Sequence, residues 1–192
     1  MPFAPSPGPG SEDREVLADE LLAIRCQLGE PEAFEALVQR WHLPLWKYLR
    51  RVLGADEPAA DMLQDVWLRV IRAFPALRDP ARLRPWLFGI ARRAVMDRLR
   101  RQYAEPRSET LDDEAHAGPE GDDGLDEALG AMHEELAAMP WLEREVLVLF
   151  YLQEFSLVQA SEVLGVPVGT VKSRLFRARR MLRERLDRKD IG

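Results

Sequence analysis

The side chains with the clearest chemical potential in this sequence are basic, and they gather near its end. Between positions 172 and 190 there are nine lysines and arginines and only three acids. A dense run of permanent positive charge along one segment is typical of a surface that binds nucleic-acid phosphates. The alternative is a solvated helix face, but such a face normally mixes its charges. The composition of this segment therefore favours nucleic-acid binding.

Patterns for catalysis or metal binding are absent from the sequence. A catalytic centre needs titratable groups that converge, but His42, His116 and His133 are widely separated along the chain. With Cys26 as the single cysteine, these histidines give no metal-ligand spacing, and no glycine-rich loop that could cradle phosphate is present. We therefore expect no enzymatic activity, no metal and no cofactor.

The basic segment needs a scaffold, and residues 155–185 predict one made of two helices. Ser156 is a suitable N-cap for the first helix, and Gly165 ends it. Pro167 can begin the second helix, because proline has no N–H to lose at a helix start. In the second helix apolar residues recur at steps of three and four. They are Val168, Val171, Leu175, Ala178, Leu182 and Leu186. A short helix, a turn with glycine and a basic second helix describe a helix-turn-helix, whose second helix fits the major groove of DNA.

The net charge of −6 hides an uneven distribution of charge. No lysine or arginine lies between Ser108 and Glu143, where acids are concentrated. Residues 104–124 combine Pro, Gly, Asp and Glu with few apolar positions, so we expect an acidic, flexible linker there. The basic residues form two blocks on either side of this linker, Arg78 to Arg101 and Lys172 to Lys189.

The rest of the chain predicts an all-α protein. Helical spacing of apolar residues runs through 13–28, 31–53, 56–74, 85–101, 125–139 and 141–152, with Pro44 expected to break or kink the second helix. The predicted fold is two small helical domains joined by the acidic flexible linker, with the helix-turn-helix in the C-terminal domain. The expected bounds are a disordered tail 1–12, a first domain 13–103, the linker 104–124 and a second domain 125–189.

The expected compartment follows from cysteine and hydropathy. A single cysteine allows no disulfide within the chain, which favours a reducing compartment. The N-terminal residues lack the basic start and apolar segment of a signal peptide, and the longest apolar run, 146–152, is too short to span a bilayer. We expect a cytoplasmic protein that does not insert into the membrane.

Two helix surfaces each allow two interpretations. On helix 56–74, one face opposite the apolar stripe is either an ordinary solvated surface with a stray leucine or a partner site. That face consists of Asp61, Gln64, Asp65, Leu68 and Arg72. On helix 85–101, Trp86 and Phe88 lie among arginines. They are either packing residues or the stacking partners of single-stranded nucleic acid.

Four motifs carry a resemblance to a known family. They are AADMLQDVWLRV at 59–70, RPWLFGIARRAVMDRLRR at 84–101, MPWLEREVLVLFYLQEFS at 139–156 and VGTVKSRLFRARRML at 168–182. In this order, with the acidic linker between the second and the third, they resemble an extracytoplasmic-function (ECF) sigma factor, the two-domain minimal type of bacterial sigma subunit. The resemblance covers about residues 15–188. Arg93 departs from it, because the family often has Asn there, and Ser161 stands where Ala is usual.

The resemblance implies a role for each surface. The helix matching 59–72 would dock on the β′ clamp helices of RNA polymerase through Asp61, Gln64, Asp65, Leu68 and Arg72. The segment 75–101 would recognise and melt the −10 element and hold an extruded base, with Arg84, Trp86, Phe88, Arg92, Arg93, Asp97 and Arg100 as its DNA-binding residues. The helix 168–183 would enter the major groove of the −35 element with Thr170, Lys172, Ser173, Arg174, Phe176, Arg177 and Arg180.

The partners implied by the resemblance are the RNA polymerase core enzyme, at its β′ clamp helices and β flap, promoter DNA and an anti-sigma factor. A second hypothesis is a self-sufficient helix-turn-helix transcriptional regulator that works without polymerase. That hypothesis accounts for the C-terminal half of the chain and leaves residues 56–104 without a role.

Overall fold

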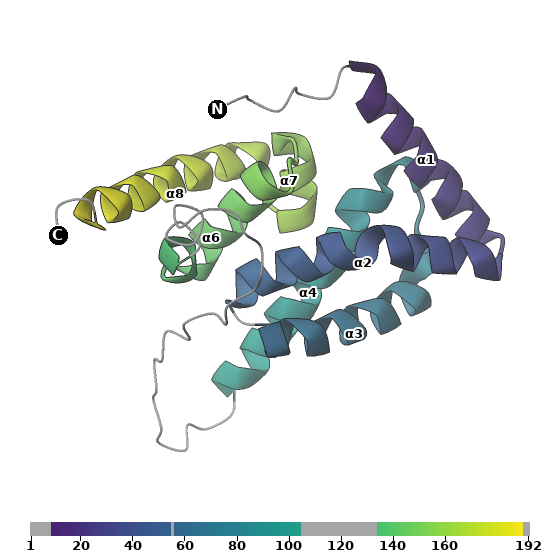
Figure 1. Ribbon diagram of the computed structural model, residues 1–192, viewed down its shortest axis with the longest axis horizontal. Helices are drawn as coiled ribbons and strands as arrows, with labels where there is room; N and C mark the ends of the chain where they lie inside the picture. The colour runs from purple at the N-terminus through teal and green to yellow at the C-terminus, as the bar shows by residue number, and fades with distance from the viewer. Residues whose placement is uncertain (1–8, 55, 105–133, 190–192) are drawn as a thin grey trace.

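The computed structural model describes residues 9–54, 56–104 and 134–189, and every regular element in these ranges is helical (Figure 1). The all-α prediction is confirmed for this part of the chain. The predicted linker lies, except for its first residue, outside the described residues, as does most of the predicted helix 125–139. Helix α1 (Pro9–Gln27) begins four residues before the predicted start at Asp13, at a proline, which is a favoured first residue of a helix.

The N-terminal unit contains α1, α2 (Pro31–Leu53), α3 (Asp56–Ala73) and α4 (Leu83–Ala104), with two short 3₁₀ turns, η1 (Phe74–Ala76) and η2 (Pro80–Arg82), between α3 and α4. Helix α3 packs against both α2 and α4, and α1 crosses α2 and η2 (Figure 1). The buried side chains follow the predicted helical spacing. In the centre of this unit they are Leu37, Trp41, Leu45, Tyr48, Leu63, Val66, Val70, Leu87 and Phe88.

Helix α2 is not broken at Pro44, which lies inside it. The apolar residues on both sides of this proline, such as Trp41 and Leu45, are buried on the same face, so packing favours one continuous helix over two. The helix ends at Gly54, whose φ of 81° is left-handed and whose N–H donates to the carbonyl of Arg50. Glycine adopts this conformation without steric cost, which explains the sharp stop.

The C-terminal unit contains α6 (Trp141–Leu147), the π-helical turn η3 (Val148–Leu152), α7 (Leu157–Leu164) and α8 (Val168–Lys189). Ser156 caps α7 as predicted: its Oγ accepts from the N–H of Gln159 at 3.2 Å, and its own N–H donates to Oε1 of Gln159 at 3.0 Å. Gly165 ends α7 with a φ of 63°. The predicted helix-turn-helix is therefore confirmed. Ser161, at the position where a helix-turn-helix usually has Ala, donates its hydroxyl to the carbonyl of Val166 at 2.6 Å across this turn.

The two units are packed against each other. Helix α7 lies along α4, and α6 and η3 reach α2 (Figure 1). Phe88 of α4 meets Phe155, just before α7, in an edge-to-face contact with 5.0 Å between ring centroids. The buried side chains of both units form one continuous core. None of the described helices is long and apolar enough to cross a membrane.

Candidate nucleic-acid and partner-binding faces

Helix α8 presents five predicted DNA-binding residues to solvent, and we call them the α8 face. They are Lys172, Ser173, Phe176, Arg177 and Arg180. The opposite side of the helix, with Val171, Leu175 and Ala178, is buried against the rest of the unit. Phe176 is 69% exposed, so its ring is available for a contact. The α8 face is therefore a free surface with basic and aromatic character.

Both arginines of the α8 face form ion pairs with acids of the C-terminal unit. Arg177 pairs with Glu143 of α6 at 3.3 Å, and Arg180 pairs with Glu184 one turn further along α8 at 3.5 Å. Arg174 differs from its neighbours, because it is half-buried and its Nη1 has no hydrogen-bond partner among the described residues. The structure thus places Arg174 on the inner side of α8 rather than on the α8 face. Thr170 is half-buried, and its carbonyl accepts from the Ser173 hydroxyl at 3.0 Å.

The predicted partner site on α3 is a single surface on the outside of the N-terminal unit, and we call it the α3 face. Its residues are Asp61, Gln64, Asp65, Leu68 and Arg72, of which only Asp65 is partly covered. Leu68 is 53% exposed, and Ile71, which is not among the predicted site residues, is 52% exposed beside it. Two exposed large aliphatic side chains one turn apart, surrounded by charges, are a small apolar patch of the kind found at interfaces.

Two arginines of the basic block of α4, Arg84 and Arg92, lie against the C-terminal unit. Arg84 donates through Nη2 to the main-chain carbonyl of Gln153, and its guanidinium lies over the Phe155 ring at 4.5 Å. Arg92 pairs with Glu145 at 3.1 Å, and its guanidinium lies 5.6 Å from the centre of the Trp141 ring. Both arginines were predicted to contact the −10 element, and in this arrangement both contact protein.

Glu145 is the most deeply buried charged group at this junction, with no exposed side-chain surface. The Tyr48 hydroxyl donates to its Oε1 at 2.9 Å. Burial raises the pKa of Glu145 to about 7, although the charge of Arg92 and the Tyr48 hydrogen bond act in the opposite direction. Burial and the adjacent carboxylate also raise the pKa of Tyr48. Removing a carboxylate from water is costly unless it is paired, which is why these three side chains are found together.

The two aromatic residues of this helix differ in position. Phe88 is fully buried between Trp41, Tyr48 and Phe155, so it is a packing residue in this arrangement and is not accessible to DNA. Trp86 is half-buried, and its ring meets Phe74 edge to face at 5.3 Å. Of the two, only Trp86 has surface left for a ligand.

Asp97 and Arg100, the last two residues predicted for the −10 surface, belong to an ion-pair network. Asp97 pairs with Arg69 of α3 at 2.7 Å and with Arg100 at 3.5 Å. The hydrogen bond from Arg69 lowers the pKa of Asp97. Arg69 also pairs with Asp65 at 3.0 Å, so one arginine connects the α3 face with Asp97 on α4. Arg69 is not among the predicted site residues, and the signal for it in the sequence is its i,i+4 spacing from Asp65.

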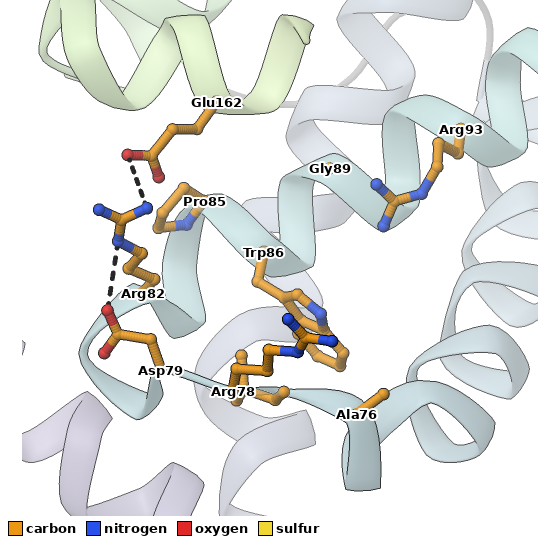
Figure 2. Close-up of a pocket in the computed structure, with 10 residues that line it drawn as sticks. Ala76, Arg78, Asp79, Arg82, Pro85, Trp86, Gly89, Arg93 and Glu162 are labelled. Carbon is orange, nitrogen blue, oxygen red and sulfur yellow. Dashed lines mark ion pairs between the residues drawn. The ribbon is translucent and has the colours of Figure 1, made fainter.

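A pocket of about 490 Å³, open to solvent, lies beside Trp86 where the loop after η1 meets α4 (Figure 2). Arg78, Arg82 and Arg93 line it together with the indole. Figure 2 shows Arg82 between Asp79 and Glu162, at 3.2 and 3.3 Å, and Glu162 comes from α7 of the other unit. Arg78 and Arg82 were missed as site residues because the loop gives no helical spacing by which to place them. Among the described residues, no group of His, Cys, Asp and Glu is arranged to hold a metal ion.

Comparison with protein families identifies both halves of the chain. The Sigma-70 region 2 model matches residues 37–105, and the Sigma-70 region 4 model matches residues 129–182. The class is therefore a sigma subunit of RNA polymerase. The match to residues 37–105 covers the segment that a self-sufficient regulator leaves without a role, so that second hypothesis is not favoured.

Individual relatives show to which group of sigma subunits the chain belongs. The chain is 33% identical over 179 residues to the ECF RNA polymerase sigma factor SigC of Mycobacterium tuberculosis, covering 88% of this chain and 90% of SigC. It is 29% identical over 174 residues to the ECF sigma factor SigW of Bacillus subtilis, covering 82% and 91%. The chain belongs to the ECF sigma factors, which direct bacterial RNA polymerase to promoters and assist promoter melting during initiation.

Solved structures agree with this assignment. The structure of CnrH in complex with the cytosolic domain of CnrY matches with a TM-score of 0.66 and 28% identity, over 88% of this chain and 97% of CnrH. The sigma factor RpoE of Bartonella quintana, in a co-crystal with the anti-sigma factor NepR, matches with a TM-score of 0.63 at 23% identity, which supports the fold alone.

Proposed function

We propose that three faces of this sigma factor divide the work of initiation. The α8 face reads the −35 element, the α3 face docks on the β′ clamp helices, and α4 with its pocket handles the −10 element. The observation that carries the proposal is the α8 face: basic and aromatic side chains stand exposed at helical spacing on the second helix of a helix-turn-helix. Such a helix fits the major groove with its outer side chains against base edges and phosphates.

The role of the α3 face rests on its exposed apolar patch. Leu68 and Ile71 would be buried on docking, and the charged residues around them would fix the orientation of the partner. We therefore add Ile71 to the predicted polymerase-binding residues. About half of the surface of Leu68 is exposed and is therefore available for such a contact.

The role of α4 rests on the pocket beside Trp86. An unstacked base needs an aromatic or apolar surface against its ring and positive charge near its phosphates. Trp86 with Arg78, Arg82 and Arg93 provides that combination. Arg78 and Arg82 join the predicted −10 residues on this ground.

The remaining parts of the proposal follow from family membership. The protein acts as a non-enzymatic initiation factor in the cytoplasm, where polymerase works, and an anti-sigma factor holds it inactive. The complex of CnrH with the cytosolic domain of CnrY supports a protein partner of this kind.

In vitro transcription with bacterial core enzyme and a library of genomic promoter fragments tests the proposal. The chain should make core enzyme initiate at a defined subset of fragments. Replacing Asp61, Gln64, Leu68 and Ile71 with alanine should abolish both core binding and transcription while the circular dichroism spectrum stays unchanged. A matched control replaces Glu35, Gln39, His42 and Leu43, which are exposed on α2. Equal core affinity for the α3 variant and this control would remove the α3 face from the polymerase contact.

A further inference from the structure

We propose that Arg93 determines which base the pocket beside Trp86 accepts, and that this base is guanine or cytosine rather than adenine or thymine. This selection rests on the proposed role of the pocket in holding an unstacked base of the −10 element. It goes beyond that role, because it assigns the contact with the edge of the base to a single side chain.

Trp86, Gly89 and Arg93 lie on one face of α4, at spacings of three and four residues. Gly89 has no side chain, and the Arg93 side chain turns back over it (Figure 2). The Nη1 and Nη2 atoms of Arg93 lie 3.7 and 4.0 Å from the point that a Cβ at Gly89 would occupy. Gly89 is three residues from Trp86, about 4.5 Å along the helix axis. The guanidinium is therefore within reach of the edge of a base that stacks on the indole.

The three arginines of the pocket differ in what their guanidinium groups contact. Arg82 pairs with Asp79 at 3.2 Å and with Glu162 at 3.3 Å, so protein carboxylates already occupy it. Arg78 comes from the loop after η1 and is exposed, which suits a phosphate contact. Arg93 is on the same helix as the indole and has no hydrogen-bond or ion-pair partner among the described residues. Its donors are thus positioned by the helix and free to bind a ligand.

The donors of Arg93 restrict which bases fit. A guanidinium group is a planar fork of N–H donors without an acceptor, so it pairs best with two adjacent acceptors. Guanine offers O6 and N7, and an unpaired cytosine offers O2 and N3. Adenine places the N6 amino donor beside N7, and thymine places the N3–H donor between its two carbonyls. Arg93 can therefore make two hydrogen bonds to guanine or cytosine and only one to adenine or thymine.

The first step of the test locates the base in the pocket without reference to its identity. Holoenzyme, assembled from the full chain and bacterial core enzyme, binds a fork promoter fragment whose non-template −10 strand is single-stranded. Each −10 nucleotide in turn is replaced by an abasic nucleotide. At the pocket position the abasic fragment should bind about 5-fold to 140-fold more weakly, which corresponds to stacking one base on an aromatic ring. Trp86→Ala should abolish that difference at this position alone.

The second step compares the four bases at that position. The unsubstituted chain should bind fragments with guanine or cytosine about 5-fold to 140-fold more tightly than those with adenine or thymine, the range for one bidentate contact. Arg93→Ala should bind all four alike, and Arg93→Gln should prefer adenine, because an amide matches N6 and N7 of adenine. The matched control, Arg101→Ala, removes the same charge from an exposed site of α4 outside the pocket and should keep the preference.

A further pair of variants tests the position of the guanidinium. Gly89→Ala adds a Cβ at ordinary van der Waals distance from Arg93, so the preference should remain. Gly89→Leu fills the space over which the guanidinium lies, so the preference should fall while the loss caused by the abasic nucleotide remains. Alanine and leucine both favour helices, so neither change should disturb α4.

Three outcomes overturn the selection by Arg93 and leave the role of the pocket intact. The unsubstituted chain could show no preference for guanine or cytosine, the preference could survive in Arg93→Ala, or Gly89→Leu could retain it in full. If no position depends on Trp86, the pocket holds no base, and the proposed role of α4 fails together with the selection.

Discussion

The surfaces of α8 and α4 contain the same kinds of residues, arginines with an exposed or half-exposed aromatic ring, yet the α8 face is exposed, whereas Arg84 and Arg92 of α4 lie against the C-terminal unit. On α8 the acids that pair with arginines, Glu143 and Glu184, come from the same unit and leave the outer face open. On α4 the acid that pairs with Arg92 is Glu145, which lies 53 positions further along the chain and belongs to the C-terminal unit. Residue composition therefore predicts what a surface can bind, whereas tertiary packing decides which of its residues are accessible.

The largest expected effect separates two adjacent arginines of α4. Arg92→Ala should destabilise the fold by about 3 to 5 kcal/mol at pH 8, because it leaves the Glu145 carboxylate buried without its cation. Arg93→Ala, at an exposed residue one position further, should change the free energy of unfolding by no more than about 0.5 kcal/mol. Urea unfolding of both variants measures this. Equal costs would show that the junction does not depend on the Arg92–Glu145 pair.

The second prediction concerns pH. The pKa of Glu145 rises from a reference value of 4.5 to about 7 in the folded chain, so the folded state binds a proton more tightly than the unfolded state between these values. Its contribution to stability is therefore fully present below about pH 4.5 and is lost as the pH rises through 7. The groups that act on this carboxyl are Tyr48 from α2, Arg92 from α4 and Arg174 from α8.

Glu145→Gln should remove this pH dependence, because an amide does not ionise. Relative to the unsubstituted chain, the variant should gain on the order of 3 kcal/mol between pH 4.5 and pH 8, which is the upper limit set by the size of the shift. Unfolding free energies at a series of pH values measure the difference. Parallel profiles for both proteins would contradict the raised pKa.

The helix-turn-helix could be predicted from sequence because its signals are local. A cap at Ser156, a glycine at 165 and a proline at 167 each act on the backbone next to them. The junction between the units could not be predicted in this way. Glu145 looks like an ordinary acid on a helix, and only its neighbours from α2 and α4 reveal a buried carboxylate. For Phe88 the sequence likewise allowed two interpretations, a packing residue or a stacking partner of single-stranded nucleic acid. Its burial in the structure makes it a packing residue.

Helix α1 shows a case in which a local sequence pattern did not predict the buried face. Leu17, Leu21 and Ile24 of this helix, with Leu28 in the turn after it, have helical spacing, which predicts a buried stripe, yet all four are exposed. The residues that face the core are instead Leu22, Ala23 and Cys26. Periodicity predicts that the segment is helical, but with apolar residues on two sides it does not determine which side packs.

The third prediction concerns the α8 face. Arg177→Ala should cost about 1 to 3 kcal/mol of discrimination at one base pair of the −35 element, if its guanidinium is bidentate to a guanine. Lys172→Ala should weaken binding to all sequences alike and lower the salt slope by about one, as loss of a phosphate contact does. Binding to −35 variants at several salt concentrations, with holoenzyme, measures both. Identical losses on every sequence for both variants would remove direct base reading by Arg177.

The smallest expected effect concerns how Arg177 is held. Glu143 is nearly buried and lies 3.3 Å from the half-exposed Arg177, so it restricts the guanidinium without covering it. Glu143→Gln should cost less than about 1 kcal/mol of discrimination at the base pair that Arg177 reads, which is the usual range for a partly exposed ion pair.

Glu184→Gln is the matched control, because it removes the same charge beside Arg180 on the same helix. Both variants should bind DNA slightly more tightly in general, since each loses one negative charge near phosphate. Only Glu143→Gln should also lose discrimination, and the difference between the two isolates positioning from charge. If both variants discriminate equally well, Arg177 is oriented by the DNA itself, and the α8 face is not preorganised before binding.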